Sequence, residues 1–448
     1  MNDSASAIVA RTLAQIEKVD PTMRAFVHVL DPEARQVAAE LDKNGCRGLL
    51  QGLTFGVKEV IDVAGVQTTG GCRNLGRRIP TRDATVVKRL KAAGSILVGT
   101  QVSHELTVGL DEPPTRNPWD LSRYPGGSSA GAGVSVITGC ASFALGTDAA
   151  GSVRIPAAMT GTVGFKPTIG TVSKYGIMRQ ASAPSIDNVG IIATTVDLVS
   201  RVFDVIGGPD VADPQTLLRV SFPRDNQVTR SSNLRGVKIG VLGRRTMDSI
   251  NEIYPLQEQV GRVFLEACDR LKCEGAVLID VEVLNWADAV STVSTIFSFE
   301  LADAHRTLLP RNGENYHPSV LGMLQQALKL SPLEIAEAVA SRTRTSLSLK
   351  EAMLTANVNA IVTPTTPRPA MVLQSFEPSR ELKSLIPYTC VCNLTGNPAL
   401  SVPIGLTDEG IPIGLQVVGR HLEDRWVLWL GGQIEKWHSP PRLPQLEV

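Results

Sequence analysis

The sequence has no excess of charge of either sign. Its 448 residues include 44 lysines and arginines and 44 aspartates and glutamates, so the formal net charge at pH 7 is +0. Proteins that bind nucleic acid usually carry a basic surplus that neutralises phosphates. We therefore expect no nucleic-acid partner. A hydrophobic fraction of 43% and a charged fraction of 20% predict an ordinary folded globular protein.

Patterns of cysteine and histidine that bind metals are also missing. The seven cysteines include no C-x-x-C pair, and the six histidines form neither an H-E-x-x-H nor an H-x-x-x-H pair. The sequence thus predicts no metal site. An odd number of cysteines without paired spacing is typical of reduced thiols, which favours a cytoplasmic location.

No segment has the composition of a targeting or membrane-spanning element. Asp3, Arg11 and Glu17 lie among apolar residues near the start, which predicts an amphipathic helix rather than a signal peptide. Residues 124–147 carry no charge, but glycine, serine and alanine are frequent among them. We expect this stretch to be buried in a folded core, and we expect no membrane partner.

Short apolar runs alternate with helical patterns along much of the chain, which is typical of an α/β fold. We expect one large domain with a central mixed β-sheet covered by helices on both sides. In this domain the core spans about residues 50–205 and 355–448, N-terminal helices occupy 1–45, and a variable, mainly helical insertion covers about 210–350. Strands are predicted at 53–58, 95–99, 141–145, 237–241, 361–362, 399–403 and 413–418, and helices at 4–19, 31–43, 83–93, 129–138, 251–272 and within 283–355.

Two serine- and glycine-rich segments stand out at the ends of predicted elements. Residues 125–133 contain four glycines around Ser128, and residues 146–156 place Ser152 after several small residues. Either segment could be an ordinary turn. Phosphate binding is not favoured, because neither a G-K-[ST] nor a G-x-G-x-x-G pattern is present. Lys58, which closes an apolar run, would by itself indicate a surface lysine.

Together these three features resemble the amidase-signature family of serine hydrolases. Members of that family share a lysine, a Gly-Gly-Ser-Ser loop and a G-T-D-x-x-G-S-[IV]-R-x-P segment. The chain has them in this order, as FGVKE at 55–59, PGGSS at 125–129 and GTDAAGSVRIP at 146–156. The resemblance covers roughly the whole chain through further matches at 164–168, 187–190, 393–399 and 410–416.

The resemblance implies a Ser-Ser-Lys mechanism in which Ser152 is the nucleophile, Ser128 relays a proton and Lys58 is the base. A serine hydroxyl is a weak nucleophile until a base takes its proton, and burial can lower a lysine pKa far enough for that role. No metal or organic cofactor is then needed. The resemblance also implies an oxyanion hole formed by the amides of Ala149, Ala150, Gly151 and Ser152, and supporting roles for Gly127, Ser129, Asp148 and Arg154.

We therefore expect an amidohydrolase that cleaves a small carboxamide to a carboxylate and ammonia or an amine. Two alternatives remain open: the glutamine-hydrolysing amidase component of a tRNA-dependent amidotransferase, and a catalytically inactive binding or scaffold protein. Ala130 and Ala150 replace glycines that are common in relatives, which affects the size of the acyl group that fits. Residues 210–350 match the family least, so substrate identity stays open, as does assembly as a homodimer.

Overall fold

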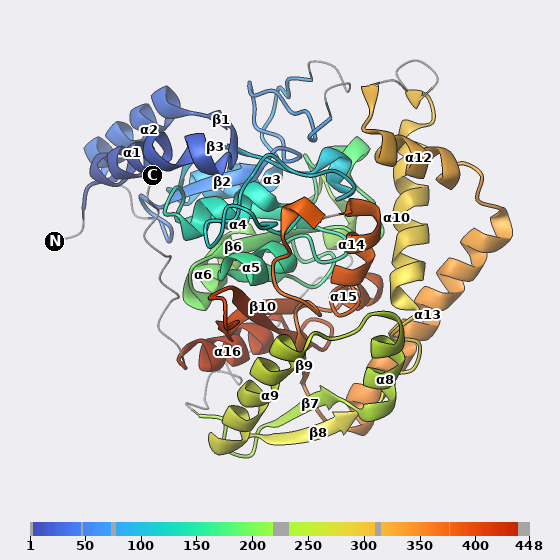
Figure 1. Ribbon diagram of the computed structural model, residues 1–448. Helices are drawn as coiled ribbons and strands as arrows, with labels where there is room; N and C mark the ends of the chain where they lie inside the picture. The colour runs from blue at the N-terminus through green and yellow to red at the C-terminus, as the bar shows by residue number, and fades with distance from the viewer. Residues whose placement is uncertain are drawn as a thin grey trace.

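The computed structural model describes residues 3–45, 48–72, 78–217, 233–309, 315–375 and 377–437. Its strands form one 11-stranded mixed sheet in the order β1-β3-β2-β4-β6-β5-β10-β11-β9-β7-β8 (Figure 1). The strands are β1 (Phe26–Val29), β2 (Thr54–Lys58), β3 (Ile96–Gln101), β4 (Phe143–Asp148), β5 (Val163–Lys166), β6 (Asn188–Ala193), β7 (Lys238–Leu242), β8 (Val277–Val281), β9 (Ala360–Pro364), β10 (Ala399–Leu406) and β11 (Pro412–Gly419).

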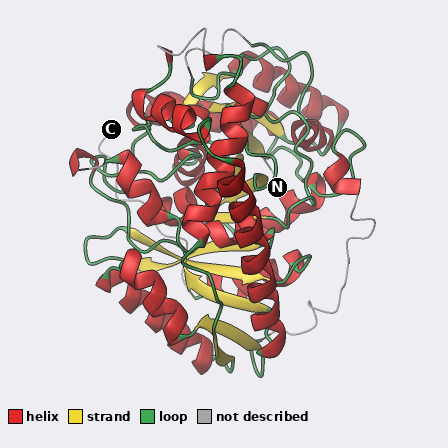
Figure 2. Cartoon of the chain, turned by 90° about the vertical axis from the view of Figure 1, so that its right-hand side faces the viewer, coloured by secondary structure: helices red, strands yellow, loops and turns green. Residues whose placement is uncertain are grey.

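Helices cover both faces of this sheet. Figure 2 shows the strands in the middle of the molecule, with helices on either side of them. One face packs against α3 (Thr85–Ala92), α6 (Val196–Ile206), α9 (Glu258–Cys273) and α16 (Asp424–Glu435). The opposite face packs against α1 (Ala5–Met23), α2 (Asp31–Asn44), α4 (Ala130–Ile137), α5 (Arg154–Thr160), α10 (Ala289–His305), α13 (Pro332–Thr355) and α15 (Cys390–Thr395). The predicted α/β fold with a covered mixed sheet is thus confirmed.

The central strands are buried along their whole length, because helices lie on both of their faces. Parallel pairing joins β2 to both β3 and β4, and antiparallel pairing joins β4 to β6. Since β2 and β4 are parallel neighbours, their carboxyl ends lie at the same edge of the sheet. This edge holds the end of β2 at Lys58 and the end of β4 at Asp148.

The sequence patterns located most elements but missed four strands. β1, β5, β6 and β8 were not predicted, and β7 and β8 extend the sheet within the region expected to be mainly helical. The rest of that region contains α8 (Arg244–Ile253), α12 (Pro318–Ala327) and the short α7 (Pro214–Leu217), besides α9, α10 and α13. The uncharged stretch 124–147 forms a turn, α4 and part of β4.

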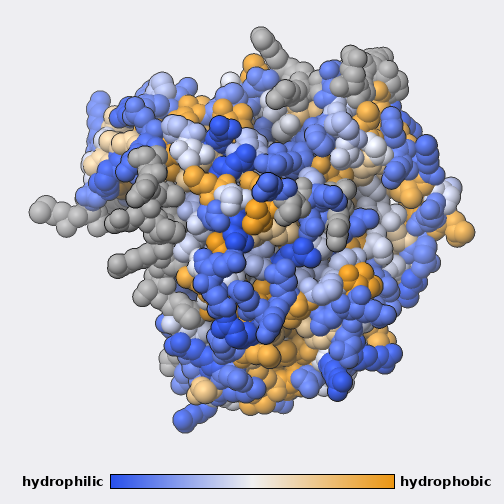
Figure 3. Space-filling model, in the orientation of Figure 1, coloured by the Kyte–Doolittle hydropathy of each residue, from blue (hydrophilic) through white to orange (hydrophobic). Residues whose placement is uncertain are grey.

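The surface is mainly hydrophilic on the face shown in Figure 3, with an apolar area low in the view near β7 and β8.

The helix α14 (Pro378–Leu385) precedes α15 and lies in the upper half of the molecule in Figure 1. Among the described helices, none combines the length and apolar character needed to cross a membrane.

Candidate active site

Lys58 lies inside the protein, at the carboxyl end of β2, with no exposed surface. Its Nζ donates hydrogen bonds to Ser128 Oγ at 2.8 Å and to Thr147 Oγ1 at 3.2 Å. The sequence places Lys58 after an apolar run, and the parallel pairing of β2 and β4 brings it next to Thr147. The predicted contact between Lys58 and Ser128 therefore exists across 70 positions of the chain.

Burial strongly perturbs the charge of this lysine. Desolvation lowers the pKa of Lys58 from 10.5 to about 7, although the carboxylates of Asp187, Asp148 and Glu59 act in the opposite direction. Burial likewise raises the pKa of Asp187, from 3.8 to about 6. With a pKa near 7, a substantial fraction of Lys58 is neutral at physiological pH and can accept a proton.

The Ser128 loop (residues 124–129) packs closely against a buried histidine. The Gly127–Ser128 peptide bond is cis, and a Cβ on Gly127 would overlap both His104 Nε2 and the Tyr124 hydroxyl. Those two polar atoms lie 2.9 Å apart, and His104 Nδ1 lies 3.1 Å from Asp111 Oδ1. The His104 amide also donates to the Ser128 carbonyl oxygen at 3.2 Å. Only glycine fits at position 127, because these groups fill the space.

Ser129 joins this loop to the Ser152 loop (residues 148–154). Its amide donates to the Ser152 carbonyl oxygen at 3.3 Å, and its hydroxyl donates to the Thr147 carbonyl oxygen at 3.4 Å. Ser128 and Ser129 are buried, whereas Ser152 is half-buried. Of the three serines, Ser152 is thus the one that solvent, and hence a small molecule, can reach.

A buried ion pair shapes the Ser152 loop. The Asp148 carboxylate accepts hydrogen bonds from the amides of Gly151 at 2.8 Å and Val153 at 3.1 Å. Arg154 faces the same carboxylate, with Nη2 at 2.8 Å from Oδ1 and Nε at 3.0 Å from Oδ2. Burial by itself raises the pKa of Asp148, but the Arg154 guanidinium outweighs this effect and the pKa is lowered to about 2. The predicted pairing of Asp148 with Arg154 is therefore present.

The amide of Gly151 was expected to contribute to the oxyanion hole. In the structure it donates its hydrogen bond to the Asp148 carboxylate instead. The amides of Ala149, Ala150 and Ser152 form no hydrogen bond with a described residue. One of these N–H groups belongs to the half-buried Ser152, and the other two belong to residues shortly before it in the chain. They are the donors that the loop offers to a bound carbonyl oxygen.

Three anchors of the Ser152 loop come from the last quarter of the chain and were not predicted. Arg154 Nη1 donates to Gln416 Oε1 at 2.6 Å and to the Thr389 carbonyl oxygen at 2.9 Å, and Arg154 Nη2 donates to Asn393 Oδ1 at 2.7 Å. Thr389 Oγ1 in turn donates to the Ala150 carbonyl oxygen at 2.6 Å. The available signal was the presence of polar residues in buried apolar elements, such as Gln416 in β11.

The arrangement combines a reachable hydroxyl, three unengaged amides and a buried lysine hydrogen-bonded to a second serine. Such a set can perform acyl transfer, since it supplies a nucleophile, a base and donors for a negatively charged oxygen. Among the described residues, no group of three histidine, cysteine, aspartate or glutamate side chains could hold a metal ion.

Comparisons with known proteins agree with this fold and geometry. The Amidase family model matches residues 7–428. The chain is 33% identical over 461 residues to a glutamyl-tRNA(Gln) amidotransferase subunit of Myxococcus xanthus, covering 96% of this chain and 93% of that protein. A crystal structure of an amidase matches with a TM-score of 0.84 and 28% identity, covering 98% of this chain and 97% of that one.

A third similar protein is the native peptide amidase of Stenotrophomonas maltophilia, whose structure matches with a TM-score of 0.83 and 27% identity. This match covers 99% of this chain and 96% of the peptide amidase chain. These similarities extend over nearly the whole chain and agree with the motifs around Lys58, Ser128 and Ser152. The chain therefore belongs to the Amidase family of hydrolases that act on carbon–nitrogen bonds.

Proposed function

We propose that this protein hydrolyses a small carboxamide to a carboxylate and ammonia or an amine, through an acyl-enzyme on Ser152. The observation that carries the proposal is the 2.8 Å hydrogen bond between buried Lys58 and Ser128. It connects a lysine whose pKa is about 7 to a serine loop that contacts Ser152.

In the first half-reaction, Ser152 Oγ attacks the amide carbon while its proton passes through Ser128 to neutral Lys58. The carbonyl oxygen becomes negatively charged in the tetrahedral intermediate, and the amides of Ala149, Ala150 and Ser152 donate to it. The C–N bond then breaks, and the amine leaves with the proton returned from Lys58.

In the second half-reaction, a water molecule attacks the acyl-enzyme in the same way. Its proton passes to Lys58 through Ser128, the ester bond to Ser152 breaks, and Ser152 recovers a proton as the carboxylic acid leaves. The sum of the two halves consumes one amide and one water. All proton transfers are made by side chains of this chain, so the scheme needs no cofactor.

A second candidate is the glutamine-hydrolysing component of a tRNA-dependent amidotransferase, which the similarity to the Myxococcus xanthus protein favours. That function uses the same hydrolytic half-reaction on one substrate. A screen of the purified protein against simple amides and glutamine separates the two, because activity on glutamine alone would favour the amidotransferase. An inactive scaffold is disfavoured, because Lys58, Ser128 and Ser152 are all present.

The roles of the two serines are tested by labelling with a serine-directed fluorophosphonate and by mapping the adduct with mass spectrometry. Ser152→Ala should lose all labelling and essentially all turnover, because no other hydroxyl in the loop is placed to attack. Ser128→Ala should still label slowly, since the nucleophile and the amide donors remain. An adduct on Ser128 or Ser129 in the wild-type protein would refute the assignment.

A further inference from the structure

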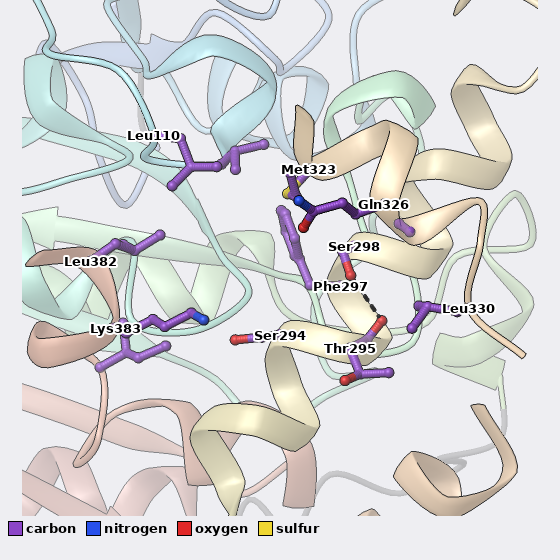
Figure 4. A pocket seen from close by; sticks show the side chains of 13 residues that line it. Leu110, Ser294, Thr295, Phe297, Ser298, Met323, Gln326, Leu330, Leu382 and Lys383 are labelled. Carbon is purple, nitrogen blue, oxygen red and sulfur yellow. Dashed lines mark hydrogen bonds between the residues drawn. The ribbon is translucent and has the colours of Figure 1, made fainter. Parts of the chain in front are cut away.

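A cavity of about 280 Å³ lies among α10, α12, α14 and the chain that follows β3. Its volume is near the lower limit of small-molecule pockets, about 300 Å³, so it suits a ligand of a few carbon atoms. Residues from the chain after β3, from α10 and α12, and from α14 form its walls (Figure 4). Most of these walls are apolar, and they include Val108, Leu110, Phe297, Met323, Leu382 and Ile386.

Two of the wall segments continue directly into contacts with the serine loops. His104, whose amide donates to the Ser128 carbonyl oxygen, lies in the same segment as Leu110. Ile386 accepts a hydrogen bond from the amide of Thr389, which also contacts the Ser152 loop. Ile386 also belongs to the same buried cluster as Ala149. One wall of the cavity is therefore linked through Thr389 to the Ser152 loop, and another lies a few positions along the chain from His104, which contacts Ser128.

Lys383 is the single charged residue among the described residues that line this cavity. Figure 4 shows its amine end directed toward Ser294 and Phe297, across the cavity from α14. Lys383 forms no ion pair with a described acidic residue. The positive charge of Lys383 would thus attract a bound anion. A bound cation would be repelled by Lys383, and no acidic residue among the described lining residues would neutralise its charge.

The hydroxyl groups on the α10 wall do not supply a second anion site. The hydroxyls of Ser294 and Thr295 donate to the carbonyl oxygens of Val290 and Ser291, at 2.7 and 3.1 Å. The hydroxyl of Ser298 donates to the Thr295 carbonyl oxygen at 3.2 Å, so all three present lone pairs rather than hydrogens. The side-chain amide of Gln326 is an uncharged donor in the same lining, so Lys383 is the one positively charged donor among the described lining residues.

We propose that this cavity receives the acyl chain of the substrate and that Lys383 selects amides whose chain ends in a carboxylate. The inferred substrates are monoamides of short dicarboxylic acids, with methylenes against the apolar walls and the carboxylate at Lys383. This inference rests on the proposed amidase function. It disfavours glutamine, whose α-ammonium group would enter a cavity lined by a lysine and by no described acidic residue.

Kinetics on matched substrates test the inference. The monoamides succinamate, glutaramate and adipamate are compared with the neutral amides butyramide, pentanamide and hexanamide by ammonia release. The wild-type protein should prefer the anionic member of the best pair by at least about tenfold in kcat/KM, the gain typical of one charge-assisted hydrogen bond that is partly open to solvent. Glutamine should be a poorer substrate than glutaramate.

Variants at one position then assign the preference to the lysine. Lys383→Met should abolish the preference by raising KM for the anionic amide about tenfold, while kcat/KM for the neutral amide stays within about twofold. Lys383→Arg, which keeps the charge, should retain the preference. Lys350→Met is a matched control, because Lys350 lies exposed on α13 and should leave both substrates unaffected.

A binding experiment that does not need turnover completes the test. Adipate should slow fluorophosphonate labelling of Ser152 in the wild-type protein and not in Lys383→Met. Equal kcat/KM for both members of every pair, an unchanged preference in Lys383→Met, or absence of protection by any of the dicarboxylates would overturn the inference. Failure of the label to modify Ser152 would instead overturn the proposed function, so the two failures are distinguishable.

Discussion

Arg154 should support the Ser152 loop without touching the substrate, and its removal should damage both stability and turnover. All five guanidinium N–H groups have partners: two interact with Asp148, and the others with Gln416, Asn393 and the Thr389 carbonyl oxygen. Neither Arg154 nor Asp148 has any exposed side-chain surface. Arg154→Ala would therefore leave a buried carboxylate without its counter-charge.

The size of the effect follows from this burial. Removing one partner of a buried ion pair typically costs about 3–5 kcal/mol, which is a large part of the roughly 5–15 kcal/mol by which proteins are stable. Turnover should fall as well, because the loop positions the amides of Ala149, Ala150 and Ser152. The loss of one oxyanion donor typically lowers kcat by about 100- to 1,000-fold. Arg154→Lys should be intermediate, because one ammonium cannot replace five planar donors.

Urea denaturation followed by tryptophan fluorescence measures the stability change, and ammonia release measures kcat and KM. Arg262→Ala is the control, because Arg262 pairs with Asp408 at 2.7 Å on the surface, where such a pair contributes about 0–1 kcal/mol. Suppose that Arg154→Ala and Arg154→Lys both keep a normal kcat and a free energy of unfolding within about 1 kcal/mol of the wild type. The bracing role would then be refuted, and a raised KM alone would indicate a substrate contact.

Three further outcomes are expected. If neutral Lys58 is the base, as proposed, its pKa of about 7 predicts that kcat/KM rises with pH up to about 7 and levels off above it. A pH profile that falls over this range would contradict the proposed role of Lys58. Thr389→Val, which removes the 2.6 Å hydrogen bond to the Ala150 carbonyl oxygen, should lower kcat about tenfold with little change in KM, and an unchanged kcat in steady-state assays would count against the anchoring role. Exhaustive EDTA treatment should leave hydrolysis unchanged, whereas a loss that a divalent ion restores would exclude the Ser-Ser-Lys scheme.

Local patterns predicted those parts of the fold that depend on local physics. The buried strands ending at Lys58 and near Asp148 are continuous apolar runs, and Gly94 follows the predicted helix that the structure places at α3. By contrast, β5 pairs with β10, which lies far along the chain, and β6 lies between β4 and β5 in the sheet. The short runs of both strands resemble other apolar segments. The sheet order depends on these long-range pairs, which no local pattern contains.

The same division holds for the candidate site. Lys58, Ser128 and Ser152 could be singled out because each lies in a short motif. Asn393 and Gln416 could not be given a role, since they act through Arg154, which is 239 and 262 positions away. The engagement of the Gly151 amide by Asp148 was likewise beyond prediction, because it depends on how the loop bends around a buried carboxylate.

The anchoring of Arg154 by residues of the last quarter of the chain has a consequence for protein synthesis. A growing chain that has emerged only as far as α14 already contains Lys58, Ser128 and Ser152, yet it lacks Asn393 and Gln416. Until β11 forms beside β10, the guanidinium lacks these two acceptors and the Ser152 loop is not held in its final shape. If Ser152 is the nucleophile, as proposed, we expect it to react with amides only after β10 and β11 have paired.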